Sequence, residues 1–255
     1  SQWLDGQKVV QIDIDPEEIG RGYTDTLRVE GDAKLTMENL LTALSTKTSA
    51  REDNTAAVAA QKTQRSNDII KVQPQGELLE AVRRAVPEDG ILISGMTQLG
   101  YYSRAHFPVY EPRTFITSSY SGNLGYAYPT ALGAKVAQPD KAVVCLSGDG
   151  GFMFNSQEMS TAVAHNINVV VVVFNDNAYG NVKRDQMNQF SGRTIGVELH
   201  NPDFVKLAEA YGARGFVANG PAELEATLKE ALTLDAPVLI EVPVGPMPSP
   251  FFRNP

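Results

Sequence analysis

The run Val169–Phe174, VVVVVF, constrains the fold more than any other stretch of the chain. A strand with one face in water alternates apolar and polar residues, whereas this run has no polar position. It therefore predicts a strand buried on both faces, as in parallel sheets that are covered by helices on either side. Its aliphatic part is far too short to span a bilayer.

The chain after Pro74 alternates short apolar segments with longer segments of helical periodicity. Strands that alternate with helices of about ten residues or more favour an α/β fold, a parallel sheet with helices on both faces. The expected strands are Ile91–Ser94, Thr114–Thr117, Ala142–Leu146, Val169–Phe174, Gly215–Ala218 and Val238–Val242. The expected helices are Gly76–Val86, Tyr126–Ala137, Ser156–His165, Asp203–Tyr211 and Pro221–Leu234.

The N-terminal part has a different character. Lys8–Ile14 predicts a strand and Lys34–Leu44 a short helix, whereas residues 46–73 are polar and alanine-rich, which is typical of a partly helical linker. We therefore expect a small N-terminal piece at 1–45, a linker, and a main domain at 74–255. The first strand has nothing before it to pair with, so the chain is expected to begin inside a domain. The N-terminus has no basic stretch followed by an apolar one, so we expect no signal peptide.

Charge and cysteine content narrow the functional classes. The net charge is -8, the isoelectric point is about 5.0, and lysine and arginine form no cluster, so neither nucleic acid nor a membrane is an expected partner. The single cysteine, Cys145, excludes an intrachain disulfide and fits a reducing, cytoplasmic location. Because it lies in an apolar strand, we interpret it as a buried hydrophobic residue rather than a nucleophile.

Two loops follow the most apolar strands, GDGG at Gly148–Gly151 and NDNAYG at Asn175–Gly180. Ligands bind beyond the carboxyl ends of parallel strands, so Asp149 and Asp176 are expected to converge there. Carboxylate and carbonyl oxygens favour Mg²⁺ or Ca²⁺ over zinc. We expect the glycines after Asp149 to open the helix containing Asn155–His165, where free backbone N–H groups accept phosphate. Either loop alone is more often an ordinary turn, but together they favour a metal-bound diphosphate.

The stretch LGAKVAQPDKAVVCLSGDGG (Leu132–Gly151), followed by VVVVVFNDNAYG (Val169–Gly180), resembles the cofactor signature of thiamine diphosphate-dependent enzymes. It is most similar to the group containing acetolactate synthase and benzoylformate decarboxylase. Further stretches resemble successive pieces of that family's pyrophosphate-binding domain, namely PQGELLEAVRRAVPEDGILISG, SGNLGYAYPTALGAK, NPDFVKLAEAYGARG and PVLIEVPV. KVVQIDIDPEEIGRGYTDTLRVEGDAKLTMENLL resembles the tail of its central α/β domain. The resemblance implies the thiamine diphosphate-binding fold, with thiamine diphosphate and Mg²⁺ as cofactors.

The resemblance also implies roles for individual residues. Asp149 and Asp176 would bind the metal through their side chains and Ala178 through its carbonyl oxygen. Asp176 stands where the family usually has Asn, which keeps the oxygen ligand but adds a negative charge. Leu124 would be the apolar wedge beneath the cofactor. The implied cofactor-binding residues are Gln98, Leu124, Gly148, Gly150, Gly151, Ala178, Tyr179 and Gly180.

The implied reaction is decarboxylation of a 2-oxo acid, C–C ligation, or both. The glutamate that activates the cofactor belongs to the family's pyrimidine-binding domain, so we expect no catalytic residue in this chain and no activity without that domain. The implied assembly is a homodimer or homotetramer. The alternative is a non-catalytic fragment or subunit that binds the diphosphate only together with a pyrimidine-binding partner.

Two further observations bear on the substrate and on a rival class. Asp185 stands where acetolactate synthases usually have Trp, and residues 181–186 are expected to border the substrate. The C-terminal segment Gly245–Pro255 is Pro-rich and is expected to be irregular and to lie over the site as a lid. A nicotinamide-dependent dehydrogenase is disfavoured because no G-x-G-x-x-G follows the first strand and Asp149 would repel a dinucleotide phosphate.

Overall fold

The computed structural model describes residues 8–23, 26–48, 53–69, 71–118 and 121–249. The chain forms two compact units, residues 1–59 and residues 60–255, and each is described by itself. The division falls inside helix α2, Thr55–Ile69. The expected boundaries at 45 and 73 stay a prediction.

The first unit contains two parallel strands, β1 (Val9–Asp13) and β2 (Thr26–Glu30), and helix α1 (Ala33–Ser45). Helix α1 begins where the side chain of Asp32 accepts the N–H of Leu35 at 3.0 Å. Strand β2 was missed from the sequence, because TLRVE has only two apolar positions and forms a strand only through its pairing with β1. No residue of α1 is buried.

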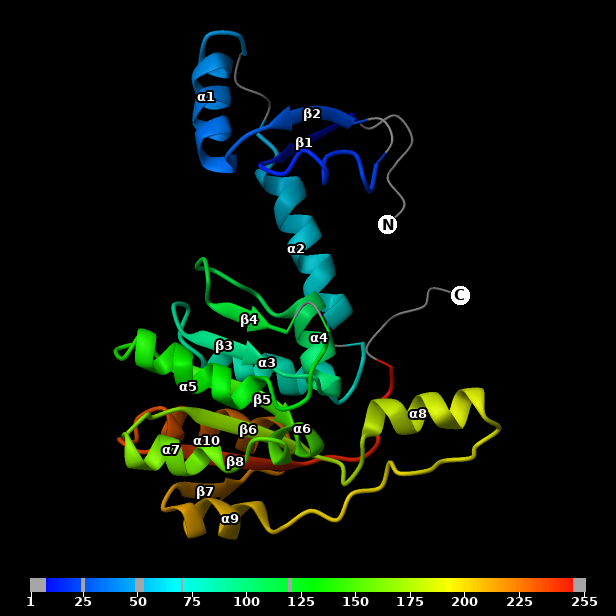
Figure 1. The fold of residues 1–255 in the computed structure, drawn as a ribbon, viewed down its shortest axis with the longest axis vertical. Helices are drawn as coiled ribbons and strands as arrows, with labels where there is room; N and C mark the ends of the chain where they lie inside the picture. Colours follow the sequence, from blue (N-terminus) through cyan, green and yellow to red (C-terminus); the bar gives the residue numbers. More distant parts are fainter. Residues whose placement is uncertain (1–7, 24–25, 49–52, 70, 119–120, 250–255) are drawn as a thin grey trace. The chain divides into compact units, whose positions relative to one another are not determined.

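The second unit is built on a six-stranded sheet with the order β4-β3-β5-β6-β8-β7, in which all neighbouring strands are parallel (Figure 1). The strands are β3 (Ile91–Ser94), β4 (Phe115–Thr117), β5 (Val143–Gly148), β6 (Val170–Asn175), β7 (Arg214–Val217) and β8 (Val238–Pro243). The six strands expected from the sequence are all present, within two residues at either end. The predicted α/β fold is therefore confirmed.

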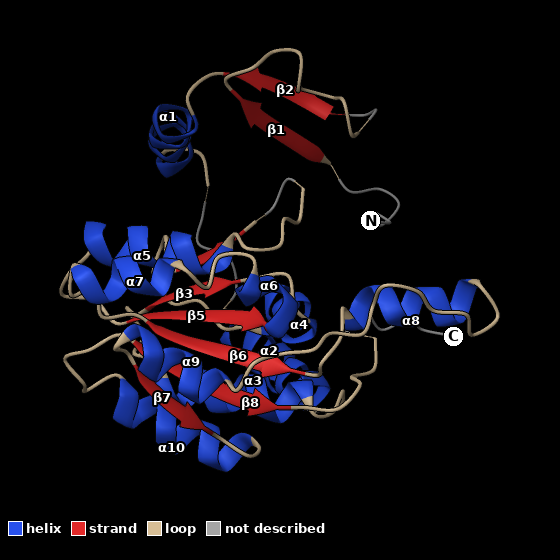
Figure 2. Ribbon diagram, turned by 60° about the horizontal axis from the view of Figure 1, so that its bottom comes forward, coloured by secondary structure: helices blue, strands red, loops and turns tan. Residues whose placement is uncertain are grey.

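Helices cover both faces of this sheet (Figure 2). One hydrophobic core contains residues of α3 (Gln75–Ala85), α4 (Gln98–His106) and α10 (Pro221–Ala231). The other contains residues of α5 (Ala127–Ala137), α6 (Asp149–Met153), α7 (Glu158–Ala164) and α9 (Phe204–Tyr211). Strand β6 contributes Val170, Val172 and Phe174 to the first core and Val171 and Val173 to the second. Burial on alternate sides explains why the run VVVVVF has no polar position. Cys145 is fully buried in the second core, as expected.

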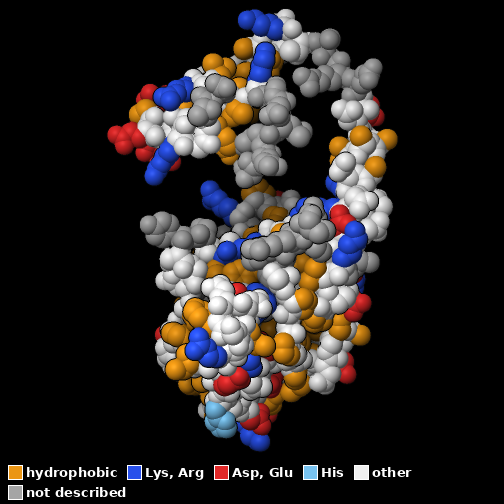
Figure 3. All heavy atoms as spheres, turned by 90° about the vertical axis from the view of Figure 1, so that its right-hand side faces the viewer, with side chains coloured by type: hydrophobic (Ala, Val, Ile, Leu, Met, Phe, Trp, Pro, Cys, Tyr) orange, Lys and Arg blue, Asp and Glu red, His pale blue; other side chains and the backbone are white. Residues whose placement is uncertain are grey.

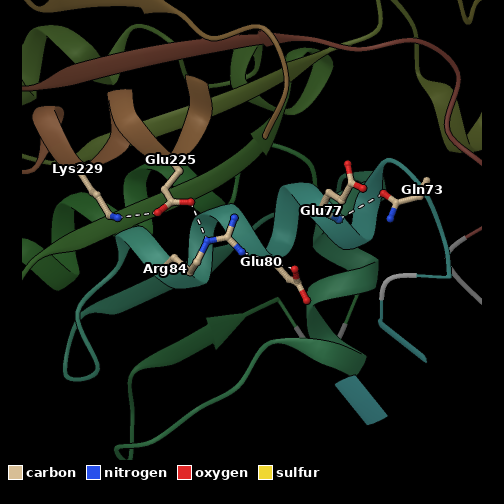
Figure 4. Close-up of polar contacts among 6 residues, drawn as sticks. All are labelled: Gln73, Glu77, Glu80, Arg84, Glu225 and Lys229. Atoms are coloured by element: carbon tan, nitrogen blue, oxygen red, sulfur yellow. Dashed lines mark hydrogen bonds and ion pairs between the residues drawn. The ribbon is translucent and has the colours of Figure 1, made fainter. Parts of the chain in front are cut away.

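Helices α3 and α10 lie side by side on one face, and charged side chains join their outer surfaces (Figure 4). Glu225 of α10 accepts from Arg84 of α3 at 2.7 Å and from Lys229 at 2.6 Å. Arg84 also lies 3.6 Å from Glu80, one turn earlier on α3. Arg84 and Lys229 are about half exposed, so these pairs contribute little to stability, and the packing of apolar side chains holds the two helices together.

The expected helix Ser156–His165 is present as α7, but its predicted start at the glycines after Asp149 is wrong, and three helices, α6 among them, were missed. The glycines after Asp149 do not open the helix that ends near His165, because α6 and α7 are separate. The chain turns between them through i to i−3 hydrogen bonds, from Asn155 N–H to Phe152 and from Glu158 N–H to Asn155, and the Asn155 side chain donates to the carbonyl of Gly125 at 2.8 Å. Helix α4 was not predicted, nor was α8 (Gly180–Gln189), which has no buried residue and hence no apolar periodicity. In the described part of the chain, no helix is long and apolar enough to cross a membrane.

Candidate functional site

The candidate site lies at the carboxyl ends of β5 and β6, the edge toward which the strand arrows of Figure 2 point. A cavity of about 200 Å³ opens there. All ten residues singled out from the sequence line it: Gln98, Leu124, Gly148, Asp149, Gly150, Gly151, Asp176, Ala178, Tyr179 and Gly180. The two loops GDGG and NDNAYG thus meet at one edge of the sheet, as the parallel-sheet argument predicts, and Gln98 and Leu124, which the resemblance implied, lie beside them.

Asp149 begins helix α6 directly after β5 and is 2% exposed. Its Oδ2 accepts from Asn201 Nδ2 at 2.6 Å. Burial raises the pKa of the Asp149 carboxyl, while hydrogen bonds from Asn201 and from the backbone N–H groups of Gly150, Ala178 and Asn177 act in the opposite direction. This carboxylate is therefore desolvated, and the hydrogen bonds that it accepts offset part of the cost of its burial.

Asp176 lies at the end of β6 in the neighbouring loop, where its Oδ1 accepts the N–H of Ala178 at 3.2 Å. Burial and the negative charge of Asp149 raise the pKa of Asp176 to about 6. The charge of Lys183, which pairs with Glu198 at 2.7 Å, lowers the pKa of Asp176 and is the smallest of these contributions. The two carboxylates thus repel each other across the cavity, and a cation bound between them would relieve that repulsion.

Glycines allow the loops to approach each other closely. A Cβ on Gly150 would lie 2.6 Å from Cε1 of Tyr179, so the tyrosine ring rests directly on this backbone. A Cβ on Gly180 would lie 2.3 Å from Oδ2 of Asp176, which therefore needs a glycine at the start of α8. Real Cβ atoms essentially never come so close to another atom. A side chain at Gly150 would displace the Tyr179 ring, and one at Gly180 would displace the Asp176 carboxylate.

A segment after α8 fixes the second loop, and sequence reasoning missed it. Leu199 N–H donates to the carbonyl of Asn177 at 2.8 Å, and Tyr179 N–H donates to that of Val197 at 2.8 Å. Asn201 then donates to Asp149 and, at 2.9 Å, to Asn175 Oδ1. The only sequence signal was a polar Asn before Pro202 in NPDF, and nothing in the sequence indicates which loop it would reach.

A second cavity of about 390 Å³ lies between α8 and the C-terminal segment that follows β8. It shares Gln98, Asp176, Ala178, Gly180 and Met247 with the first cavity. The half-buried Arg184 of α8 lines it and donates to Gln98 Oε1 at 2.8 Å and to Asn181 Oδ1. The sequence predicted that Asn181 borders the substrate, but it did not predict the contact between Arg184 and Gln98. The expected lid is described as far as residue 249, and its remaining residues lie outside the described part.

Comparison with known proteins identifies the family. Residues 95–242 match the model described as "Thiamine pyrophosphate enzyme, C-terminal TPP binding domain". The chain belongs to the thiamine pyrophosphate enzyme family. It is 33% identical over 258 residues to a probable acetolactate synthase large subunit of Methanococcus aeolicus, covering 94% of this chain and 43% of that protein. It is 34% identical over 238 residues to the acetolactate synthase large subunit of Haemophilus influenzae, covering 89% of this chain and 41% of that protein.

A probable 2-ketoarginine decarboxylase of Pseudomonas aeruginosa is 31% identical over 242 residues, covering 92% of this chain and 42% of that protein. The chain thus spans about two fifths of the length of the curated relatives it matches. The match to the thiamine pyrophosphate-binding domain confirms both the recognised family and thiamine diphosphate as its cofactor.

The cavity fits this cofactor in its chemistry. Within the described residues, no group of three or more His, Cys, Asp and Glu side chains is placed to hold a metal ion. A metal here would therefore take the two carboxylates together with main-chain, ligand or water oxygens, which suits a hard cation such as Mg²⁺. Leu124 lines the same cavity and is 36% exposed, so an accessible apolar surface lies beside the polar end.

Proposed function

We propose that the chain is the cofactor-binding part of a thiamine diphosphate- and Mg²⁺-dependent enzyme that acts on 2-oxo acids by decarboxylation, C–C ligation or both. The observation that carries the proposal is the convergence of Asp149 and Asp176 beside the glycine loops, inside the region that matches the cofactor-binding domain. The names of the related acetolactate synthases and of the probable 2-ketoarginine decarboxylase support 2-oxo acids as the substrate class.

Each part of the site would have a distinct task. Asp149, Asp176 and the carbonyl oxygen of Ala178 would hold the metal, and the backbone at Gly150 and Gly151 would face the diphosphate. Gln98, Gly148, Tyr179 and Gly180 would complete the wall around the diphosphate, and Leu124 would support the rings. When bound, thiamine diphosphate supplies the nucleophilic carbon and the electron sink that decarboxylation requires.

Activation of the cofactor would depend on a partner. The described residues that line the cavity include no glutamate, so the acid that activates the pyrimidine ring would come from a pyrimidine-binding domain, in the same polypeptide or in another subunit. Exposed apolar side chains on α8, at Val182 (49%) and Met187 (52%), support such a partner, and Figure 3 looks onto this side of the molecule. A homodimer or homotetramer would bring two such parts together, and the composition is consistent with a cytoplasmic location.

The domain division belongs to the same proposal. Residues 1–45 would be the tail of a central domain, 46–73 a linker and 74–255 the pyrophosphate-binding domain. The apolar side chains of α1 support this division, because Leu40, Leu41 and Leu44 are 41%, 72% and 41% exposed and would be covered by further parts of such a domain.

Calorimetric titration with thiamine diphosphate in the presence of Mg²⁺ tests the proposal. We expect binding that requires Mg²⁺ and that D149A abolishes. D140A is the matched control, because Asp140 is an exposed acid in the turn that leads into the opposite end of β5. Unchanged binding by D149A would refute the assignment of the metal site.

Among the described residues no glutamate lines the cavity, which also favours the second candidate, a non-catalytic piece that binds the cofactor diphosphate only with a pyrimidine-binding partner. Titrations with thiamine diphosphate and Mg²⁺ before and after addition of a pyrimidine-binding domain distinguish the two candidates. Binding that appears only after that addition supports the second. Turnover of a 2-oxo acid by the chain alone would exclude it.

A further inference from the structure

The cavity proposed to hold the diphosphate has an unfavourable charge balance. Its described lining residues include two acids, Asp149 and Asp176, and no Lys, Arg or His. A diphosphate group adds several negative charges to these two. One divalent metal ion neutralises only part of that total, so a further cation close to the cavity would strengthen binding.

Arg184 is placed to supply this charge. Arg184 lines the second cavity. Asp176 and Gln98 line both the first cavity and the second. Arg184 Nη1 donates to Gln98 Oε1 at 2.8 Å, a contact that joins α8 to the start of α4 across 86 positions of the chain. The guanidinium group is therefore directed toward the shared wall rather than outward into solvent.

The described hydrogen-bond acceptors around this guanidinium group are all neutral. They are the amide oxygens of Gln98 and Asn181 and, at 3.5 Å each, the carbonyls of Met247 and Pro248. No ion pair of Arg184 is found among the described residues. The neighbouring Lys183 instead pairs with Glu198 at 2.7 Å. Among the described residues, therefore, no acidic side chain lies within ion-pair distance of Arg184.

A purely structural role explains these contacts less well. Arg184 could fasten the C-terminal segment, but its contacts to that segment are long, at 3.5 Å. The carbonyl of Pro248 is already bound by Gln75 Nε2 at 2.9 Å. Outside its own helix, the shortest contact of Arg184 is the one to Gln98, a residue that lines both cavities.

We propose that Arg184 is a diphosphate-binding residue of this protein, which adds positive charge at the wall shared by the two cavities. This inference rests on the proposed function and goes beyond it, because neither the glycine loops nor the two acids supply such a charge. Arginine suits the task, because its guanidinium group stays charged and can bind Gln98 and a phosphate oxygen at the same time.

The test is calorimetric titration of the chain with inorganic pyrophosphate and Mg²⁺, which needs no pyrimidine-binding domain. We compare wild type, R184Q and R184K at low and at high KCl. R193Q is the control, since Arg193 is an exposed arginine beyond the end of α8 that lines neither cavity. R184Q should bind about tenfold more weakly than wild type at low salt, the effect of losing one charge-assisted hydrogen bond.

R184K should lie between wild type and R184Q because it keeps the charge but not the guanidinium geometry. The ratio between wild type and R184Q should shrink at high KCl because salt screens the charge. Equal affinities of wild type and R184Q at low salt, or a loss that is independent of salt, overturn the inference and leave the proposed function intact. Failure of wild type itself to bind magnesium pyrophosphate overturns both. R184M keeps the test decisive if R184Q does not fold, because it also removes the charge, and affinity equal to that of R193Q with an unchanged salt dependence would overturn the inference.

Discussion

Replacement of Asp176 by Asn tests whether the negative charges of the site destabilise the folded protein. Burial and the charge of Asp149 raise the pKa of Asp176 from 3.8 to about 6. The folded protein therefore holds this proton more tightly than the unfolded chain does, and the ionised carboxylate destabilises the fold. The penalty is absent below about pH 4, grows as the pH rises, and is complete above about pH 6.

The magnitude follows from the same shift. A difference of about 2 pKa units corresponds to roughly 3 kcal/mol. Partial access of solvent reduces this to about 1–2 kcal/mol. Without metal, D176N should thus raise the free energy of unfolding by about 1–2 kcal/mol at pH ~7.5 and by almost nothing at pH ~4. Asparagine keeps an oxygen that can accept the N–H of Ala178, so the loop should not change.

Urea unfolding in the presence of a chelator measures this difference. D185N removes a negative charge from an exposed position on α8 and is the matched control, for which we expect little change at either pH. Saturating Mg²⁺ should cancel the advantage of D176N, because the metal stabilises the wild-type carboxylate. A metal-free D176N that is less stable than wild type at pH ~7.5 would refute the reasoning.

Three further outcomes can be checked. F152A should lower the free energy of unfolding by about 3–5 kcal/mol in urea titrations, because this side chain is 1% exposed between two aromatic rings. G150A should weaken binding of Mg²⁺ and thiamine diphosphate in calorimetry, since its Cβ would displace Tyr179, whereas G133A, facing open space on α5, should not. N201A should lower the Mg²⁺ affinity about tenfold by releasing Asp149, and an unchanged affinity would contradict this role.

The large-scale organisation of the main unit could be predicted from local patterns. Continuous apolar runs predicted strands, and amphipathic segments such as Gly76–Val86 predicted helices. A helix that packs on a sheet buries one face, so apolar residues recur along it at helical spacing. Helix α8 shows the limit of this reasoning, since a helix without buried residues carries no such period. Strand β2 shows another limit, because a short charged strand is stabilised by its partner rather than by its own composition.

For the candidate site, the sequence by itself determined that GDGG and NDNAYG follow neighbouring buried strands, and a parallel sheet brings such loops to one edge. Only the tertiary structure decided which distant side chains complete that edge. Asn201 reaches Asp149 across 52 positions and Arg184 reaches Gln98 across 86. The physical reason is that a single hydrogen bond between remote residues leaves no periodic trace along the chain, whereas burial of a whole strand does.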